Sequence, residues 1–193
     1  MAMDELILVD AKDNDIGYAE KESCHIVPTK LHRAFSIFIL DSTGAMLIHK
    51  RSPVKKTWPD FWSNSCCSHP RKGEDLPDAV ARRLQEELGF ACPLQHLFRF
   101  TYKSNYDNEY GEHEIDHVFI GQYDGEVRPN PDEIADFKFI TVKELSQDVE
   151  VHPEKYTPWF KKALPRVIRY IATHKDKTGT IGTSLKKPRK TIG

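Results

Sequence analysis

The chain has 193 residues with 28 Lys or Arg and 29 Asp or Glu, a formal net charge of -1 at pH 7. This length suits one sizeable domain, and the balanced charge excludes the strong basic excess typical of nucleic-acid-binding proteins. The best apolar run, residues 34–40, is too short to cross a bilayer, and the N-terminus does not resemble a signal peptide. We therefore expect a cytoplasmic protein with reduced cysteines, no membrane span and no nucleic-acid partner.

The first half of the chain predicts mainly strands. Short runs of apolar or alternating residues, separated by Gly-, Pro- and Asp-containing turns, are typical of hairpins. The expected strands lie at residues 6–10, 16–20, 31–40, 45–51 and 61–67. The intervening segments 21–30 and 52–60 are expected to be irregular, because each combines proline with basic and polar residues.

The second half predicts helices as well as strands. The clearest helix covers residues 77–88, with Asp75 as N-cap, Pro77 in the first turn and Gly89 as the stop. Further helices are expected from residue 142 and over 159–173, and strands at 97–102 and 115–123 with a polar loop between them. This mixture predicts an α/β (α+β) fold, in which a mixed sheet is sandwiched between helices.

The predicted helix at 77–88 carries two basic–acidic pairs one turn apart, Arg82 with Glu86 and Arg83 with Glu87. One interpretation is two surface ion pairs, each contributing roughly a few tenths of a kcal/mol. The other is a ligand helix that offers Glu86 and Glu87 to a cation at the edge of its apolar stripe. Spacing within the helix leaves both interpretations open.

The stretch from residue 68 to residue 90 resembles the Nudix box, G-x5-E-x7-R-E-U-x-E-E-x-G-U, where U is apolar. The matching residues are Glu74, Arg82, Leu84, Glu86, Glu87, Gly89 and Phe90. Ser68 replaces the first glycine, and Arg83 replaces a glutamate that belongs to the metal-binding carboxylates of Nudix hydrolases. Arg83 removes a metal ligand and adds a phosphate-binding group, so we expect a diphosphate substrate without ordinary hydrolysis.

Adjacent cysteines occur in the stretch W-S-N-S-C-C-S-H-P at residues 62–70. A disulfide between Cys66 and Cys67 is disfavoured, because the small ring would strain the peptide between them. In an extended chain, Cys67 and His69 point to one face and Cys66 to the other. Cys67 is therefore expected to work beside a metal held by His69.

Further potential metal ligands are spread along the chain. His25 and His32 lie upstream, and Glu112 and Glu114 share a face if that segment is extended. Three imidazoles and two carboxylates make an octahedral N/O site suited to Mn²⁺, Mg²⁺ or Zn²⁺. By spacing alone, however, each of the nine histidines is more often a surface residue than a ligand.

A wider set of residues resembles the type I isopentenyl-diphosphate isomerases, a branch of the Nudix fold. The set is His25, Leu31-His32, Arg51, Lys55-Lys56, Trp58-Pro59, Asn64-Ser65, Cys67-Ser68-His69-Pro70, Arg83, Glu112, Glu114 and Thr157-Pro158-Trp159. The resemblance runs from about residue 6 to residue 159. It divides the chain into an N-terminal hairpin with the first metal ligand (1–30), a Nudix-like catalytic domain (31–163), the end of the C-terminal helix (164–174) and a basic tail expected to be disordered (175–193).

The resemblance implies a role for each site residue. The divalent metal is expected at His25, His32, His69, Glu112 and Glu114. Glu87 is expected to help hold a second Mg²⁺ on the substrate diphosphate, which Lys21, Arg51, Lys55 and Arg83 would contact. Cys67 and Glu114 match the catalytic pair, with Tyr102 as a proton relay and Trp159 facing the carbocation. Without the motif, the four cations are solvated side chains and Trp159 an ordinary core residue.

The implied reaction moves the double bond of isopentenyl diphosphate to give dimethylallyl diphosphate, so the expected partner is a small allylic or homoallylic diphosphate. Two alternatives stay open: a Nudix hydrolase of a nucleoside or sugar diphosphate, and a non-catalytic module that binds metal or diphosphate. The sequence also leaves open the identity of the metal, the choice between monomer and homodimer, and the direction of proton flow between Glu114 and Cys67.

Overall fold

The computed structural model describes residues 4–174. Within them, nine strands form one sheet: β1 (Glu5–Val9), β2 (Asp15–Glu20), β3 (His32–Leu40), β4 (Ala45–Arg51), β5 (Trp62–Ser63), β6 (Cys66–Ser68), β7 (Leu94–Asn105), β8 (Gly111–Gln122) and β9 (Ile134–Thr141). The helices are α1 (Lys21–His25), α2 (Leu76–Leu88), α3 (Val142–Val151) and α4 (Pro158–His174), with a 3-10 turn at Pro153–Lys155. In this part of the chain, no helix is both long and apolar enough to span a bilayer.

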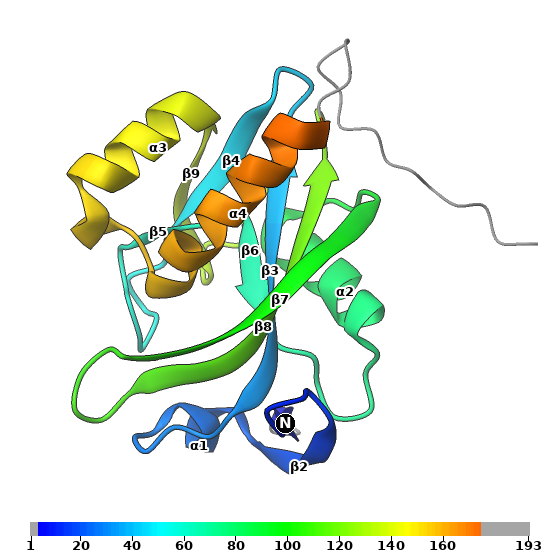
Figure 1. The fold of residues 1–193 in the computed structure, drawn as a ribbon, viewed down its shortest axis with the longest axis vertical. Helices are drawn as coiled ribbons and strands as arrows, with labels where there is room; N and C mark the ends of the chain where they lie inside the picture. Colours follow the sequence, from blue (N-terminus) through cyan, green and yellow to red (C-terminus); the bar gives the residue numbers. More distant parts are fainter. Residues whose placement is uncertain (1–3, 175–193) are drawn as a thin grey trace, which may run out of the picture.

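Strand β3 is the centre of the sheet (Figure 1). It runs parallel to β8 along its whole length, with His32 opposite Glu114 and Leu40 opposite Gln122. It also pairs antiparallel with β6, and its two ends contact β1 and β4. Strand β7 pairs with β8, while β5 and β9 pair with β4. Parallel and antiparallel pairs in one sheet confirm the predicted mixed sheet.

Two apolar cores cover the two faces of the sheet. Helix α2 buries Val80, Leu84 and Leu88 against one face, together with alternate residues of β3 such as Ile37. Helices α3 and α4 pack on the other face, where Phe38 of β3 contributes to the core. Successive side chains of a strand point to opposite faces, so β3, buried at every position except Arg33, supplies both cores. The predicted sandwich of a sheet between helices is confirmed.

Most expected elements are present, and helix α2 ends at its expected stop signal. The helix expected at 77–88 is α2, and Gly89 ends it in the left-handed conformation with φ 75°. This backbone favours glycine, and an added Cβ would lie 2.9 Å from the Cβ of Arg128. Asp75 precedes the helix in an extended conformation, but its side chain makes no capping hydrogen bond. The basic tail predicted at 175–193 lies outside the described residues.

Three expectations about secondary structure are wrong. Residues 21–25 form the helix α1 rather than irregular chain, and strand β9 was not expected at all. Glu112 and Glu114 lie inside β8 rather than at the end of a loop. Strands β7 and β8 are longer than predicted. At the start of β8, Glu112 and Glu114 are buried rather than exposed to solvent, so polarity does not mark the end of this strand.

Candidate active site

In two of the predicted histidine ligands, one ring nitrogen is hydrogen-bonded to a backbone carbonyl oxygen. His25 ends α1, one turn after Lys21, and its Nδ1 lies 2.6 Å from the Lys21 carbonyl oxygen. His32 begins β3, and its Nδ1 lies 2.8 Å from the Lys30 carbonyl oxygen. A carbonyl oxygen only accepts, so Nδ1 carries the proton in both rings. The two Nε2 atoms are left as lone-pair donors, the usual state of a metal-binding histidine.

The five predicted metal ligands meet in one cluster. The ligand atoms lie within 4.8 Å of one another, and the members are His25, His32, His69, Glu112 and Glu114. His69 follows β6, and its Nε2 lies 2.7 Å from Glu114 Oε1. His25 Nε2 lies 2.9 Å from Glu112 Oε2. The parallel pairing of His32 with Glu114 gathers ligands from segments about 80 residues apart in the chain.

The donor set fits a divalent cation. Glu112 and Glu114 are each 6% exposed, and within residues 4–174 the buried His32 Nε2 and Glu112 Oε2 complete no hydrogen bond. Burial and the nearby Glu114 raise the pKa of Glu112. Burial also opposes ionisation of Glu114, but the neighbouring imidazoles of His32 and His69 outweigh it and hold the pKa of Glu114 well below its usual range. Unsatisfied lone pairs and adjacent carboxylates are the features that a bound cation would compensate.

The cluster forms one wall of a cavity of about 590 Å³. Every predicted site residue lines this cavity except His32 and Glu87. His32 is fully buried behind the other ligands, and Glu87, 3% exposed, forms an ion pair with Arg83. Burial raises the pKa of Glu87 although Arg83 opposes the effect. The structure therefore brings the predicted metal, acid–base and diphosphate residues to one place.

The predicted catalytic residues lie together in the cavity beside the metal-ligand cluster. The Tyr102 hydroxyl donates to Glu114 Oε2 at 2.6 Å, and the two residues face each other across β7 and β8. Burial and the Glu114 carboxylate raise the pKa of Tyr102 well above its usual value, so Tyr102 keeps its proton. Trp159 is 4% exposed and donates from Nε1 to Ser63 Oγ at 3.0 Å. Trp159 thus belongs to a core and lines the cavity as well.

The two adjacent cysteines lie on opposite faces of β6, as predicted. Cys66 is fully buried in the core under α2, whereas Cys67 lines the cavity. Burial raises the pKa of Cys67 to about 12, although Arg51 and Lys55 act in the opposite direction. The substrate-free protein therefore holds Cys67 as a thiol.

The predicted diphosphate contacts line the same cavity: Lys21, Arg51, Lys55 and Arg83. Arg51 is held by the carbonyl oxygens of Thr57 and Trp58, at 2.9 and 3.0 Å, and its guanidinium carbon lies 5.2 Å from the centre of the Trp159 ring. Arg83 pairs with Glu86 at 2.9 Å as well as with Glu87. The surface-pair interpretation of α2 is wrong for Glu87, which is buried.

Several polar residues of the cavity region were not predicted. Ser36 and Tyr110 line the cavity, and Glu133 forms ion pairs with Lys55 and Arg83. Glu133 lies in a polar stretch between β8 and β9 that also contains Asp132. Nothing in the spacing of this stretch distinguishes one carboxylate from the other. Tertiary structure alone identifies Glu133 as a neighbour of the predicted cations.

Comparisons with known proteins agree with this geometry. A model of the Nudix domain matches residues 30–162. The chain is 44% identical over 165 residues to isopentenyl-diphosphate Delta-isomerase 2 of Aromatoleum aromaticum, covering 86% of this chain and 87% of that one. It is 47% identical over 163 residues to isopentenyl-diphosphate Delta-isomerase 2 of Photorhabdus laumondii, covering 84% and 92%.

Solved structures show the same fold at lower identity. The crystal structure of DR0079 from Deinococcus radiodurans matches with a TM-score of 0.68 at 20% identity, covering 84% of this chain and 98% of that one. The MutT protein of Methanosarcina mazei matches with a TM-score of 0.60 at 17% identity, covering 72% and 94%. With curated relatives at well over 30% identity along most of its length, the chain belongs to the isopentenyl-diphosphate Delta-isomerases, within the Nudix family.

Proposed function

We propose that this enzyme interconverts isopentenyl diphosphate and dimethylallyl diphosphate, in isoprenoid biosynthesis, by protonation and deprotonation through a tertiary carbocation. One observation carries the proposal. A single cavity is lined by an acid–base pair, a cluster suited to a divalent cation, and four basic side chains suited to a diphosphate. A binding module would need the last two features, whereas the acid–base pair of Cys67 and Glu114 serves a reaction.

The chemistry requires one acid and one base, because an unactivated alkene must gain a proton at one carbon and lose one from another. In the forward direction we assign the acid to the Glu114–Tyr102 pair, which adds a proton to the terminal CH₂ and leaves a tertiary cation. The Cys67 thiolate then removes a proton from the neighbouring CH₂, and the diphosphate stays intact. The substrate-free protein, with a Cys67 thiol and a Glu114 carboxylate, is in the state that follows the forward reaction and precedes the reverse one.

The carbocation needs protection from water, which would trap it as an alcohol. Trp159 and Tyr102 are largely buried aromatic residues that line the cavity. We assign Trp159 to stabilise the cation with its ring, a contact that contributes about 2 kcal/mol when desolvated. The hydrogen bond from Trp159 Nε1 to Ser63 fixes the orientation of that ring.

His25, His32, His69, Glu112 and Glu114 would hold a divalent cation, Mn²⁺, Mg²⁺ or Zn²⁺, and Glu87 would help hold a Mg²⁺ that accompanies the diphosphate. When bound, these cations supply positive charge that neutralises the carboxylates and the diphosphate. Lys21, Arg51, Lys55 and Arg83 bind the diphosphate oxygens and orient the hydrocarbon toward Cys67. We further propose a cytoplasmic enzyme, because its four cysteines are free and one of them performs the chemistry.

The alternative is a hydrolase that cleaves a diphosphate, since the fold occurs in such enzymes. Arg83 disfavours it, because this guanidinium stands where hydrolases carry a metal-binding carboxylate. Two experimental products separate the two activities: the isomerase leaves the diphosphate intact, whereas the hydrolase releases a phosphate.

The decisive experiment is incubation of the purified protein with isopentenyl diphosphate and Mg²⁺ in D₂O, followed by NMR. We expect deuterium in a methyl group of dimethylallyl diphosphate, because the acid exchanges its proton with solvent between turnovers. Release of phosphate would instead support the hydrolase. Unchanged substrate, with metal bound, would leave a binding module as the better account.

A further inference from the structure

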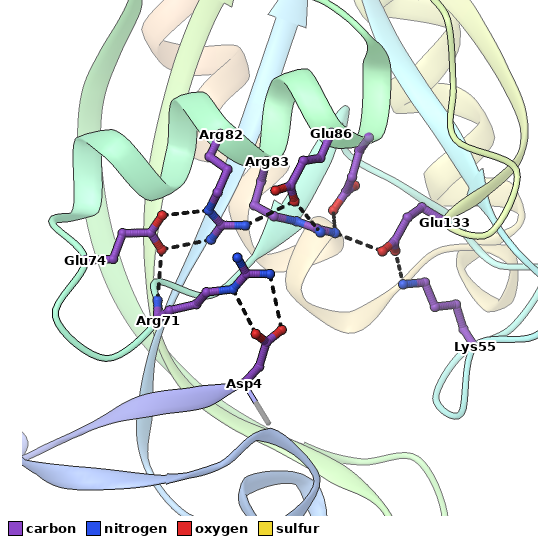
Figure 2. A network of polar contacts seen from close by, with 9 residues as sticks. Asp4, Lys55, Arg71, Glu74, Arg82, Arg83, Glu86 and Glu133 are labelled. Atoms are coloured by element: carbon purple, nitrogen blue, oxygen red, sulfur yellow. Dashed lines mark hydrogen bonds and ion pairs between the residues drawn. The ribbon is translucent and has the colours of Figure 1, made fainter. Parts of the chain in front are cut away.

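Glu133 connects two of the cations assigned to the diphosphate (Figure 2). One carboxylate oxygen contacts Lys55 Nζ, and the other lies 3.0 Å from a guanidinium nitrogen of Arg83. Lys55 comes from the loop after β4, whereas Arg83 comes from α2. Glu133 itself belongs to the connection between β8 and β9, so three separate segments meet at this carboxylate.

The backbone around Glu133 ties the same segments together. The Glu133 carbonyl oxygen accepts from the Ser52 N–H at 3.0 Å, at the start of the loop that carries Lys55. The Glu133 N–H donates to Asn130 at 3.0 Å, and the Asn130 N–H donates to the Glu87 carbonyl oxygen at 2.9 Å. These bonds fix Glu133 between α2 and the loop. The Glu133 backbone is therefore held on both sides, by Ser52 and by Asn130.

The three charged groups are largely removed from solvent. Side-chain exposure is 25% for Lys55, 20% for Glu133 and 14% for Arg83. Two cations brought together in such surroundings repel each other, and a carboxylate between them removes the repulsion. Burial opposes ionisation of Glu133, but Lys55 and Arg83 outweigh it and lower the pKa of Glu133 to about 2. Glu133 is therefore an anion at neutral pH.

We infer that Glu133 is a positioning residue that holds Lys55 and Arg83 ready for the two ends of a diphosphate. The inference rests on the proposed function. A carboxylate that gives one oxygen to each cation sets them at a spacing that two phosphate oxygens can use. Glu133 touches neither Cys67 nor Glu114, so its removal weakens diphosphate binding and leaves the proton transfers unchanged.

The test compares Glu133→Gln with wild type in the full chain. Calorimetry with inorganic diphosphate and Mg²⁺ measures binding without turnover, and kinetics with isopentenyl diphosphate give KM and kcat. We expect Kd and KM to rise at least about tenfold, as when one partner of a buried charge pair is lost. We expect kcat to stay within about threefold of wild type. The matched control is Glu126→Gln, which removes an exposed carboxylate paired with Arg128 in the same connection and should change neither constant.

A double-mutant cycle with Lys55→Met separates positioning from a general structural role. If Glu133 acts through Lys55, Glu133→Gln weakens diphosphate binding less in the Lys55→Met background than in wild type. Equal losses in both backgrounds would overturn the inference. Should Glu133→Gln fail to fold, Glu133→Asp keeps the charge on a side chain one methylene shorter. We expect that variant to bind diphosphate more weakly, and wild-type affinity would contradict the inference.

The outcomes also distinguish this inference from the proposed function. Wild-type protein that isomerises its substrate while Glu133→Gln keeps a wild-type Kd overturns the inference alone. Tighter binding by Glu133→Gln overturns it too, since Glu133 would then be a competitor of the diphosphate. Wild-type protein that binds diphosphate but yields no isomer refutes the proposed function, while a weakened Glu133→Gln still supports the positioning role.

Discussion

Cys66 and Cys67 are neighbours in the chain, but they lie in chemically different surroundings. Cys66 is enclosed by the core under α2, and Cys67 lines the cavity beside Glu114. The difference arises because successive side chains of a strand point to opposite faces of the sheet. A substitution at Cys66 can therefore serve as the control for one at Cys67.

Replacement of Cys67 by serine should abolish most of the turnover and leave the fold intact. A hydroxyl has nearly the size of a thiol but is a much weaker acid, so we expect kcat to fall by at least about a thousandfold. The control is Cys66→Ala, for which we expect near-wild-type kcat and a loss of about 1–2 kcal/mol in stability. A Cys67→Ser variant with wild-type turnover in the NMR assay would remove Cys67 from the mechanism.

Individual residues of the site were predictable to the extent that a motif contains them. His25, His69 and Glu114 belong to a recognisable spaced set, and they meet as expected. Glu133 carries no such signal, because it is one of several carboxylates in a polar connection. Its neighbours are set by how that connection docks on α2. A contact between three distant segments cannot be inferred from the local sequence of any one of them.

Helix α2 shows that the residues of the Nudix box do not share one task. Arg82 donates to both oxygens of Glu74, at 2.6 and 2.8 Å, and Glu74 also accepts from the Arg71 N–H at 3.0 Å (Figure 2). This ion pair fastens the loop before α2 to the helix. Arg83, one residue further along, turns instead toward the cavity. The box therefore combines a structural clasp with a cavity-lining cation, Arg83, which we assign to the diphosphate.

The clasp predicts that Glu74→Gln reduces stability without reducing turnover. The hydrogen bond from Arg82 lowers the pKa of Glu74 in the folded protein. The ion pair therefore contributes fully to the free energy of unfolding at pH values above the ordinary pKa of glutamate. This contribution is lost as the pH falls through the lowered pKa of the folded state. We expect a loss of about 1 kcal/mol in urea denaturation at pH 7, shrinking in acid, with wild-type kcat. A large loss of kcat, or a stability loss independent of pH, would contradict the structural role.

The helices and strands differed in how well the local sequence predicted them. Helix α2 was predictable because Val80, Leu84 and Leu88 form a periodic stripe that ends at Gly89. Helix α1 has only five residues, and a single turn depends on packing against β8 rather than on its own propensity. The start of strand β8 was predicted too late, because Glu112 and Glu114 are polar but buried. A prediction that assigns buried strands to apolar residues cannot include them.

At the scale of the whole molecule, a cation bound in the ligand cluster would stabilise the fold. Residues His25, His32 and Glu112 come from different elements, so a bound cation would cross-link them. Removal of metal with a chelator should therefore lower the melting temperature. A free metal concentration of about 100 times Kd would raise the free energy of unfolding by about 2.7 kcal/mol. For a chain of this size, this corresponds to an increase of roughly 5–10 °C in the melting temperature.

Thermal melts with EDTA, and after re-addition of Mg²⁺, Mn²⁺ or Zn²⁺, test this expectation. His32→Asn should melt at a temperature that metal no longer affects, whereas His152→Asn, at an exposed histidine outside the cluster, should behave as wild type. A melting temperature that is the same with and without every metal would count against a cation in the cluster.

The parallel pairing of β3 with β8 also bears on how the protein folds. His32 faces Glu114 in the native register, and a slip of one residue between these strands would turn one of the two to the opposite side of the sheet. A cation could then no longer be coordinated by both. A bound metal would thus stabilise only chains whose central strands are correctly aligned, and would select the native register over a slipped one.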